Sequence, residues 1–131
     1  MTQINAYLTF NGNCREAMLF YQKCLGGKLT LQSVEESPMS DQWPKDVQKN
    51  ILHASLINKQ ISLLSSDMGS EKLIMGNAIS LALACSNEDE INHFFKNLSE
   101  QGNITHPLHR FFDGTIGALT DKYGINWLFK L

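Results

Sequence analysis

The four histidines are the residues of this 131-residue chain best suited to acid–base chemistry or metal binding, because imidazole changes charge near neutral pH. His106 and His109 are three positions apart in a predicted strand. Alternation places them on opposite faces, where they cannot hold one ion unless Pro107 bends the strand. His93 falls on the polar side of a predicted helix, where we expect it to be solvated. These three histidines therefore do not predict a metal centre.

His53 is the remaining histidine and the one catalytic candidate. It shares a predicted strand face with Ile51, Ser55 and Ile57. The simpler interpretation is a strand histidine held by hydrogen bonds. The alternative is a role in a pocket, where His53 and Asp113 would supply acid–base chemistry, since a neutral imidazole can donate or accept a proton near pH 7.

The three cysteines, Cys14, Cys24 and Cys85, are an odd number without metal-ligand spacing. They predict reduced thiols in a cytoplasmic protein rather than a disulfide framework. Cys14 and Cys24 fall in one predicted helix, where we expect them to pack in the core. A catalytic thiol would need an activating neighbour, and no histidine adjoins any of the three in the sequence.

Strand and helix signals place these side chains in a first module. Residues 4–10 are rich in β-branched and aromatic side chains and predict a strand. Asn13 can cap a helix that runs to about residue 25, with Glu16 completing a pattern that resembles a capping box. Further strands are predicted at 29–34, 51–57 and 61–64. The intervening loop 35–50 is long, with a helical turn expected near 45–48, and such loops are often functional.

A second module repeats the order strand, helix and three strands. Residues 78–85 predict a strand. Asn87 can cap the next helix, whose acidic first turn suits the helix dipole and whose end is expected near residue 101. The last strands are predicted at 104–108, 115–120 and 125–131.

The two modules also match residue by residue at a spacing of 75 positions. The matched pairs are Phe20 with Phe95, Gly27 with Gly102, Leu29 with Ile104, and Thr30 with Thr105. We therefore predict one α+β domain over 1–131, made of tandem βαβββ modules at about 1–66 and 77–131 with a joint at 67–76. Each curled sheet, mixed or antiparallel, would carry its helix on one face and leave the other face concave, as part of a cleft.

Composition excludes several functions. Eleven basic and thirteen acidic residues give a net charge of −2, so no basic surface for nucleic acid or for a membrane is expected. The apolar runs are too short to span a bilayer, and the first residues lack the features of a signal peptide. A cytoplasmic location is the resulting expectation.

Several motifs resemble the vicinal oxygen chelate superfamily, also called the glyoxalase/bleomycin resistance/dioxygenase proteins, and in particular its PhnB-like branch. The resemblance covers essentially the whole chain and is carried by residues 7–14, 25–27 and 120–127, with Ala17, Phe20, Tyr21, His53, Ala54, Ser66 and Asp67. It implies a paired βαβββ fold that is frequently a homodimer. It does not imply one reaction, because unrelated functions share one fold.

Enzymes of that superfamily hold a divalent metal through His, Glu or Gln side chains from four strands. The resemblance places those positions at Ala6, Ser62, Leu81 and Leu128. A shift of one residue gives Tyr7, Leu63, Ser80 and Trp127 instead. None of these is a strong ligand for such an ion, so we expect no metal and no other cofactor. Metal-dependent lyase, dioxygenase and fosfomycin-resistance activities are correspondingly disfavoured.

The concave face is instead expected to form a small-molecule pocket, apolar with a few hydroxyls and one amide. Its predicted lining is Ala6, Leu8, Phe10, Trp43, His53, Ser62, Leu64, Leu81, Asn126 and Leu128. Met39, Phe111 and Phe112 could cover it, although packing or dimer contact would explain them equally well.

The leading functional hypothesis is a metal-free dimer that binds a small, partly apolar molecule. One alternative is an enzyme with a nonstandard metal site or with acid–base chemistry at His53. Another is a regulatory module that contacts proteins, for which the concave face would be filled by Leu8, Phe10, Leu81 and Leu128. PhnB-like sequences are also associated with 3-demethylubiquinone methylation. The chain lacks a glycine-rich methyl-donor motif after a strand, so no dependence on S-adenosylmethionine is expected.

Overall fold

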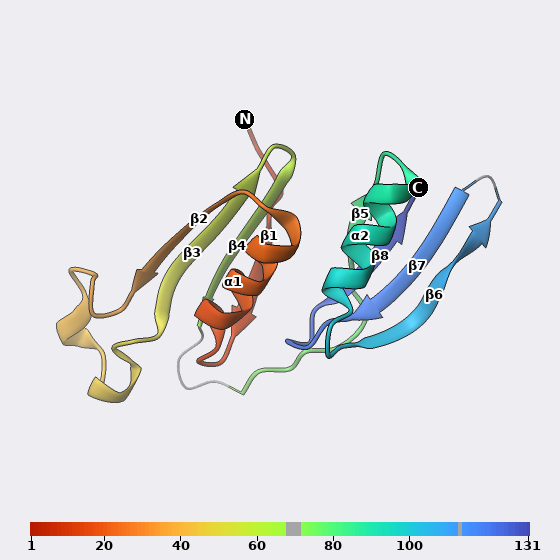
Figure 1. The fold of residues 1–131 in the computed structure, drawn as a ribbon. Helices are drawn as coiled ribbons and strands as arrows, with labels where there is room; N and C mark the ends of the chain where they lie inside the picture. The colour runs from red at the N-terminus through yellow and green to blue at the C-terminus, as the bar shows by residue number, and fades with distance from the viewer. Residues whose placement is uncertain (68–71, 113) are drawn as a thin grey trace. The chain divides into compact units, whose positions relative to one another are not determined.

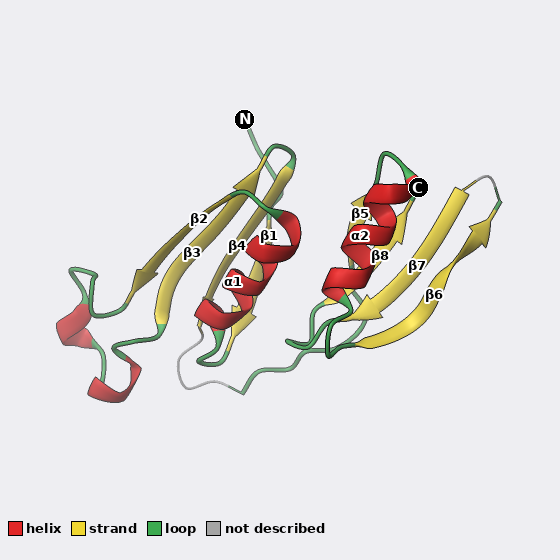
Figure 2. Ribbon diagram, viewed as in Figure 1, coloured by secondary structure: helices red, strands yellow, loops and turns green. Residues whose placement is uncertain are grey.

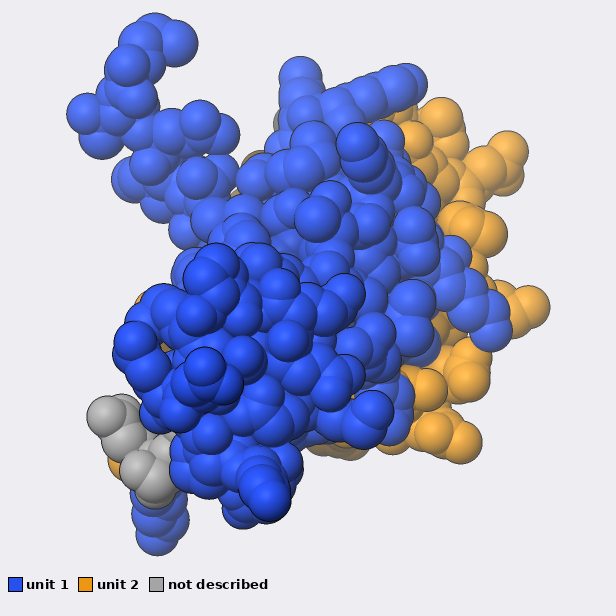
Figure 3. Space-filling model, turned by 90° about the vertical axis from the view of Figure 1, so that its left-hand side faces the viewer, with its two compact units in different colours: residues 1–73 blue, residues 74–131 orange. Residues whose placement is uncertain are grey.

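The computed structural model describes residues 1–67, 72–112 and 114–131 and divides into two compact units, Met1–Leu73 and Ile74–Leu131. Figure 3 colours the units separately. The division falls inside the stretch expected as a joint. Both units have the predicted order of one strand, one helix and three strands (Figure 1). The α+β class and the two βαβββ modules are therefore confirmed.

Unit 1 is a four-stranded sheet with a helix on one face (Figure 2). Its elements are β1 (Ala6–Phe10), α1 (Cys14–Leu25), β2 (Lys28–Ser33), β3 (Ile51–Asn58) and β4 (Ile61–Asp67). The strand order is β1-β4-β3-β2, with β1 parallel to β4 and the other pairs antiparallel. Two 3-10 turns, Ser40–Gln42 and Lys45–Val47, lie in the long loop, and the second confirms the expected turn.

Unit 2 has the same design. Its elements are β5 (Leu81–Ala84), α2 (Glu88–Leu98), β6 (Asn103–Phe111), β7 (Gly114–Thr120) and β8 (Asn126–Lys130). The strand order is β5-β8-β7-β6, with β5 parallel to β8. β5 is shorter than the predicted strand because the Asn126 amide donates to the carbonyls of Gly76 and Ile79, which holds the preceding residues out of the ladder.

The helix caps differ between the units. Asn87 accepts a hydrogen bond from the Glu90 N–H at 2.8 Å, as expected. The Asn13 side chain makes no capping bond, so the predicted capping box is wrong. Asp67, at the end of β4, takes that role: its Oδ1 accepts from the N–H groups of Gly12 and Cys14 at 2.8 and 2.9 Å. A carboxylate suits the positive end of a helix dipole, and its source here is 53 residues away in sequence.

The glycines that follow the two helices share one structural reason. An ideal Cβ on Gly27 would overlap the Ile57 carbonyl and lie 2.7 Å from the Asn58 Cβ. One on Gly102 would lie 2.6 Å from the Thr120 carbonyl oxygen. In each unit the chain leaving the helix therefore passes against the backbone of the third strand. The 75-residue spacing of this pair reflects equivalent positions in two copies of one module.

No helix among the described residues is long and apolar enough to cross a membrane.

Candidate functional site

The register of unit 1 decides which side chains face away from α1. Leu8 and Phe10 are 8% and 1% exposed, and they pair with Ser65 and Asp67 on the helix face. Ala6 pairs with the buried Leu63 on that same face. The expectation that Ala6, Leu8 and Phe10 line the face away from α1 is therefore wrong. These three residues face α1, and the residues between them face the opposite side, because successive side chains of a strand alternate between faces.

The open face of unit 1 is the sheet surface opposite α1, and hydroxyl groups dominate it. Its side chains from β1, β4 and β3 are Tyr7, Thr9, Ser62, Leu64, Ser66, His53, Ser55 and Ile57. The Tyr7 hydroxyl donates to Ser66 Oγ at 3.0 Å, and the Tyr7 side chain is half exposed. The predicted pocket residues Ser62, Leu64 and His53 thus share a face, and their part in binding stays a prediction.

His53 lies exposed on this face, opposite Gln32 of β2. Among the described residues, no hydrogen bond or ion pair joins it to a carboxylate, which is what an acid–base dyad would require. Asp113, its expected partner, lies outside the described residues.

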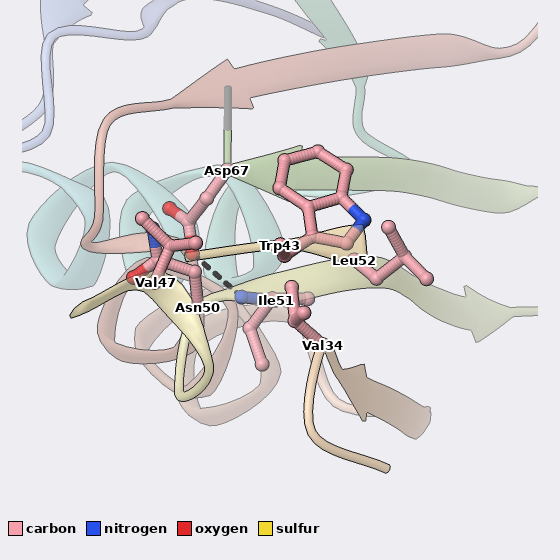
Figure 4. A pocket seen from close by; sticks show the side chains of 7 residues that line it. All are labelled: Val34, Trp43, Val47, Asn50, Ile51, Leu52 and Asp67. Carbon is pink, nitrogen blue, oxygen red and sulfur yellow. Dashed lines mark hydrogen bonds between the residues drawn. The ribbon is translucent and has the colours of Figure 1, made fainter. Parts of the chain in front are cut away.

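Trp43 lines a small pocket where the long loop meets the start of β3 and the end of β4 (Figure 4). The pocket measures about 10 Å³, room for a single water molecule and not for an organic ligand. Asp67 Oδ2 accepts from the Ile51 N–H at 2.8 Å at its base, and Gln48 Nε2 donates to the Trp43 carbonyl at 2.9 Å. Trp43 therefore helps to order the long loop. The pocket that it lines is too small for the organic ligand that was expected beside Trp43.

Cys14 is a buried thiol that donates to or accepts from Ser65 Oγ at 3.2 Å. Burial raises its pKa to about 11, and the neighbouring Asp67 carboxylate adds to that rise. A thiol that stays protonated at neutral pH is a poor nucleophile. Cys14 and Cys24 are both buried, as predicted, and Cys14 serves packing rather than catalysis.

In unit 2 the register again reverses one prediction. Leu81 pairs with Trp127 and Leu83 with Phe129, and both aromatic rings are buried against α2. Leu81 therefore faces the helix rather than the open side, and the smaller Ala82 takes the open position opposite Leu128. Leu128, predicted as a pocket residue, does lie on the open face.

Asn126 lies on the open face but its amide group is engaged. Besides donating to Gly76 and Ile79, it accepts from the Thr120 hydroxyl at 2.8 Å. These three bonds join the segment before β5 to β7 and β8. The Asn126 amide thus stabilises the fold of unit 2.

A β-bulge on β6 changes the expected placement of two histidines. His106 pairs with Ala118 and His109 with Ile116, so three steps along β6 match two along β7. Ala118 and Ile116 both face away from α2, which puts the two histidines opposite residues of one face. The bulge spans Pro107 and Leu108, where the sequence allowed for a bend. Among the described residues, no third metal-ligand side chain joins them.

The open face of unit 2 carries a pocket of about 270 Å³ at the end of the β6–β7 hairpin. Its lining is Phe111, Phe112, Gly114, Thr115, Ile116, Leu128, Lys130 and Leu131. Phe111 and Phe112, expected as covering residues, contact each other with ring centroids 4.4 Å apart. Ile116 and Lys130 were not predicted. Lys130 falls on the same alternation as Leu128 in β8, but Ile116 joins that face only through the pairing of β7 with β8.

The open faces do not fit the metal centre implied by the superfamily resemblance. The open positions on the four relevant strands are Tyr7 and Thr9, Ser62, Leu64 and Ser66, Ala82 and Ala84, and Asn126, Leu128 and Lys130. They supply hydroxyls, an amide and an ammonium instead of the imidazole and carboxylate ligands that such an ion requires. The corrected strand phases therefore place no imidazole or carboxylate at these positions.

A methyl-donor site of the doubly wound type is equally ill matched. Such sites need a glycine-rich turn between a strand and a helix of a parallel sheet. The turn from β1 to α1 is Asn11–Asn13, with a single glycine, and among the described strands each sheet has one parallel pair.

The family model described as 3-demethylubiquinone-9 3-methyltransferase matches residues 2–129. The structure of PA1353 from Pseudomonas aeruginosa is 32% identical, covers 98% of this chain and 96% of its own, and superposes with a TM-score of 0.89. A PhnB protein from Bacillus cereus is 25% identical, covers 99% of each chain and has a TM-score of 0.79. Protein YjdN of Escherichia coli (strain K12) is 26% identical, over 98% of this chain and 94% of its own.

The wider fold likeness extends to a glyoxylase/bleomycin resistance protein/dioxygenase domain from Frankia sp. EAN1pec. It is 15% identical, covers 100% of this chain and 98% of its own, and has a TM-score of 0.63. At that identity the comparison carries the fold alone.

Proposed function

Because the chain belongs to the family described as 3-demethylubiquinone-9 3-methyltransferase, and has the fold of the glyoxalase proteins, we propose that it is a PhnB-like protein that binds a small, partly apolar molecule without a metal. The methyl-transfer reaction in the family's description is not part of the proposal, since the described part of the chain has no glycine-rich turn of the kind that binds the donor.

The observation that carries the proposal is the 270 Å³ pocket on the open face of unit 2. Ligand pockets are concave and mostly apolar with a few polar groups, and this lining has that composition. Leu8, Phe10 and Leu81, which would have filled the open faces of a protein-contact module, turn toward the helices instead. That orientation favours ligand binding over the regulatory alternative.

Metal independence is tested by growth with added manganese, nickel and zinc, followed by elemental analysis of the purified protein. We expect no stoichiometric transition metal, because the four strand positions lack strong ligands. The same preparation, titrated with S-adenosylmethionine in a calorimeter, is expected to give no one-to-one isotherm. Retention of one equivalent of metal, or one-to-one binding of the methyl donor, would contradict the proposal.

We also propose that the protein is a homodimer. Within the part of the chain that the structure describes, each sheet ends in two strands that pair on one side only, β1 and β2 in unit 1 and β5 and β6 in unit 2. Unpaired strand edges favour association with another strand, and a two-fold dimer is the commonest way to cover them. Sedimentation equilibrium at micromolar concentration is expected to give twice the 14.8 kDa mass of the chain. A mass of one chain would exclude the dimer.

A further inference from the structure

Lys130 is the one charged side chain among the described residues that line the pocket of unit 2. It extends from β8 on the open face, between Ala84 and Ile116 of the neighbouring strands. Both neighbours are uncharged, and none of the ion pairs among the described residues involves Lys130. An ammonium group beside an apolar pocket is therefore available to a ligand.

We infer that this pocket takes a small organic monocarboxylate with an aromatic or alkyl body, and that Lys130 pairs with its carboxylate. The inference rests on the proposed function and narrows it to one ligand class. A carboxylate would give Lys130 a charge-assisted hydrogen bond, which is stronger than a hydrogen bond between neutral groups.

The apolar part of the pocket is preformed for the body of such a ligand. Ile116 and Leu128 contribute from β7 and β8, and Phe111 and Phe112 from the hairpin end. The two rings meet edge to face and remain 50% and 89% exposed. Phe112 has a φ of 55° in the turn of the β6–β7 hairpin, as Lys59 has a φ of 53° in the turn between β3 and β4. The exposed surfaces of the two rings give the pocket an apolar wall that a ligand can contact.

The charge and size of the site restrict the ligand. The Glu88 carboxylate accepts from the Thr115 hydroxyl at 3.4 Å on the helix side of the sheet. Among the described lining residues there is thus no acidic side chain. Drug-sized ligands occupy pockets of about 300–1,000 Å³. A volume of about 270 Å³ suits something smaller.

The test is a titration of ¹⁵N-labelled protein with 3-phenylpropanoate and, separately, with 3-phenylpropanol, which keeps the body and lacks the charge. We expect the acid to bind about tenfold more tightly, with amide shifts at residues 111, 112, 116, 128 and 130. In Lys130→Met, the affinity for 3-phenylpropanoate should fall to that for 3-phenylpropanol. The matched control Lys96→Met removes an exposed lysine on α2 and should leave both affinities unchanged.

Each contrary outcome separates the inference from the proposed function. Equal binding of acid and alcohol, or an unchanged preference in Lys130→Met, overturns the inference and leaves small-molecule binding intact. Shifts confined to Tyr7, His53 and their neighbours on unit 1 also overturn it, because the ligand would then occupy a different face. If neither compound, nor a panel of neutral and anionic apolar fragments, shifts any amide, both proposals fail.

Discussion

Gly27→Ala is expected to lower the free energy of unfolding by more than about 3 kcal/mol, because two costs combine at one residue. The backbone of Gly27 has a φ of 105°, a conformation that is strained for any residue with a Cβ. The added Cβ would also overlap the Ile57 carbonyl, and the Asn58 side chain there is anchored to the Leu25 carbonyl at 2.7 Å. Neither neighbour can move without disturbing β3.

Urea denaturation followed by circular dichroism measures this loss, and Gly12→Ala is its matched control. Gly12 has a nearly equal φ of 96°, but no described atom lies within 4 Å of the position of its Cβ. The control therefore isolates the conformational cost, expected at about 1–2 kcal/mol. If the two variants lose equal stability, the close approach of Gly27 to β3 contributes nothing and our explanation of the glycine is wrong.

Asp121→Ala is expected to destabilise the protein by about 3 kcal/mol and to lower its Tm by about 10 °C. The carboxylate is 4% exposed, and it accepts from the N–H groups of Tyr123 and Ile125 at 2.8 and 3.1 Å and from the Trp127 indole at 2.8 Å. Alanine would leave these donors without their acceptor in the interior. The variant should also change the fluorescence of Trp127, which lies in the core of unit 2.

Differential scanning calorimetry of two further variants checks the cause. Asp121→Asn retains one acceptor oxygen but turns an amide N–H toward a donor, so an intermediate loss is expected. Asp89→Ala removes an exposed aspartate from the first turn of α2 and should cost only about 0.5 kcal/mol through the helix dipole. A loss in Asp89→Ala comparable to that in Asp121→Ala would mean that net charge, and not the buried hydrogen bonds, sets the stability.

The order of elements could be predicted because it depends on local signals. β3 and β7 carry β-branched or apolar residues in runs bounded by turns, and the 75-residue spacing of Gly27 and Gly102 reveals the duplicated module. These local signals did not predict which side of β1 and β5 faces the helix. In β1 and β5 the larger apolar residues, Leu8, Phe10 and Leu81, face the helices, where they bury the most surface. The apolar character of these alternating residues was the available signal for that phase.

Other parts of the site depend on contacts that local sequence does not encode. Asp67, at the end of β4, caps α1 in place of Asn13. The two residues of this bond are 53 positions apart, so no short-range sequence pattern predicts it. The place of Lys130 in a pocket follows only once β8 is paired with β7 and the hairpin end brings Phe111 and Phe112 beside it. The sequence therefore predicts which modules form, and the pairing of strands decides which side chains meet.

The irregular pairing of β6 has a consequence for how this strand can change in length. Between Asn103 and Phe111, eight steps along β6 match six along β7, because one extra residue enters on each side of His106. Each irregularity places an extra residue of β6 opposite β7, so both ends of the strand stay paired and only the residues around His106 change face. Loss of one residue on either side of His106 would remove one irregularity and leave Phe111 opposite Gly114, on the face of Lys130. Length variation in the middle of this strand is thus compatible with the pocket, in odd as well as in even numbers.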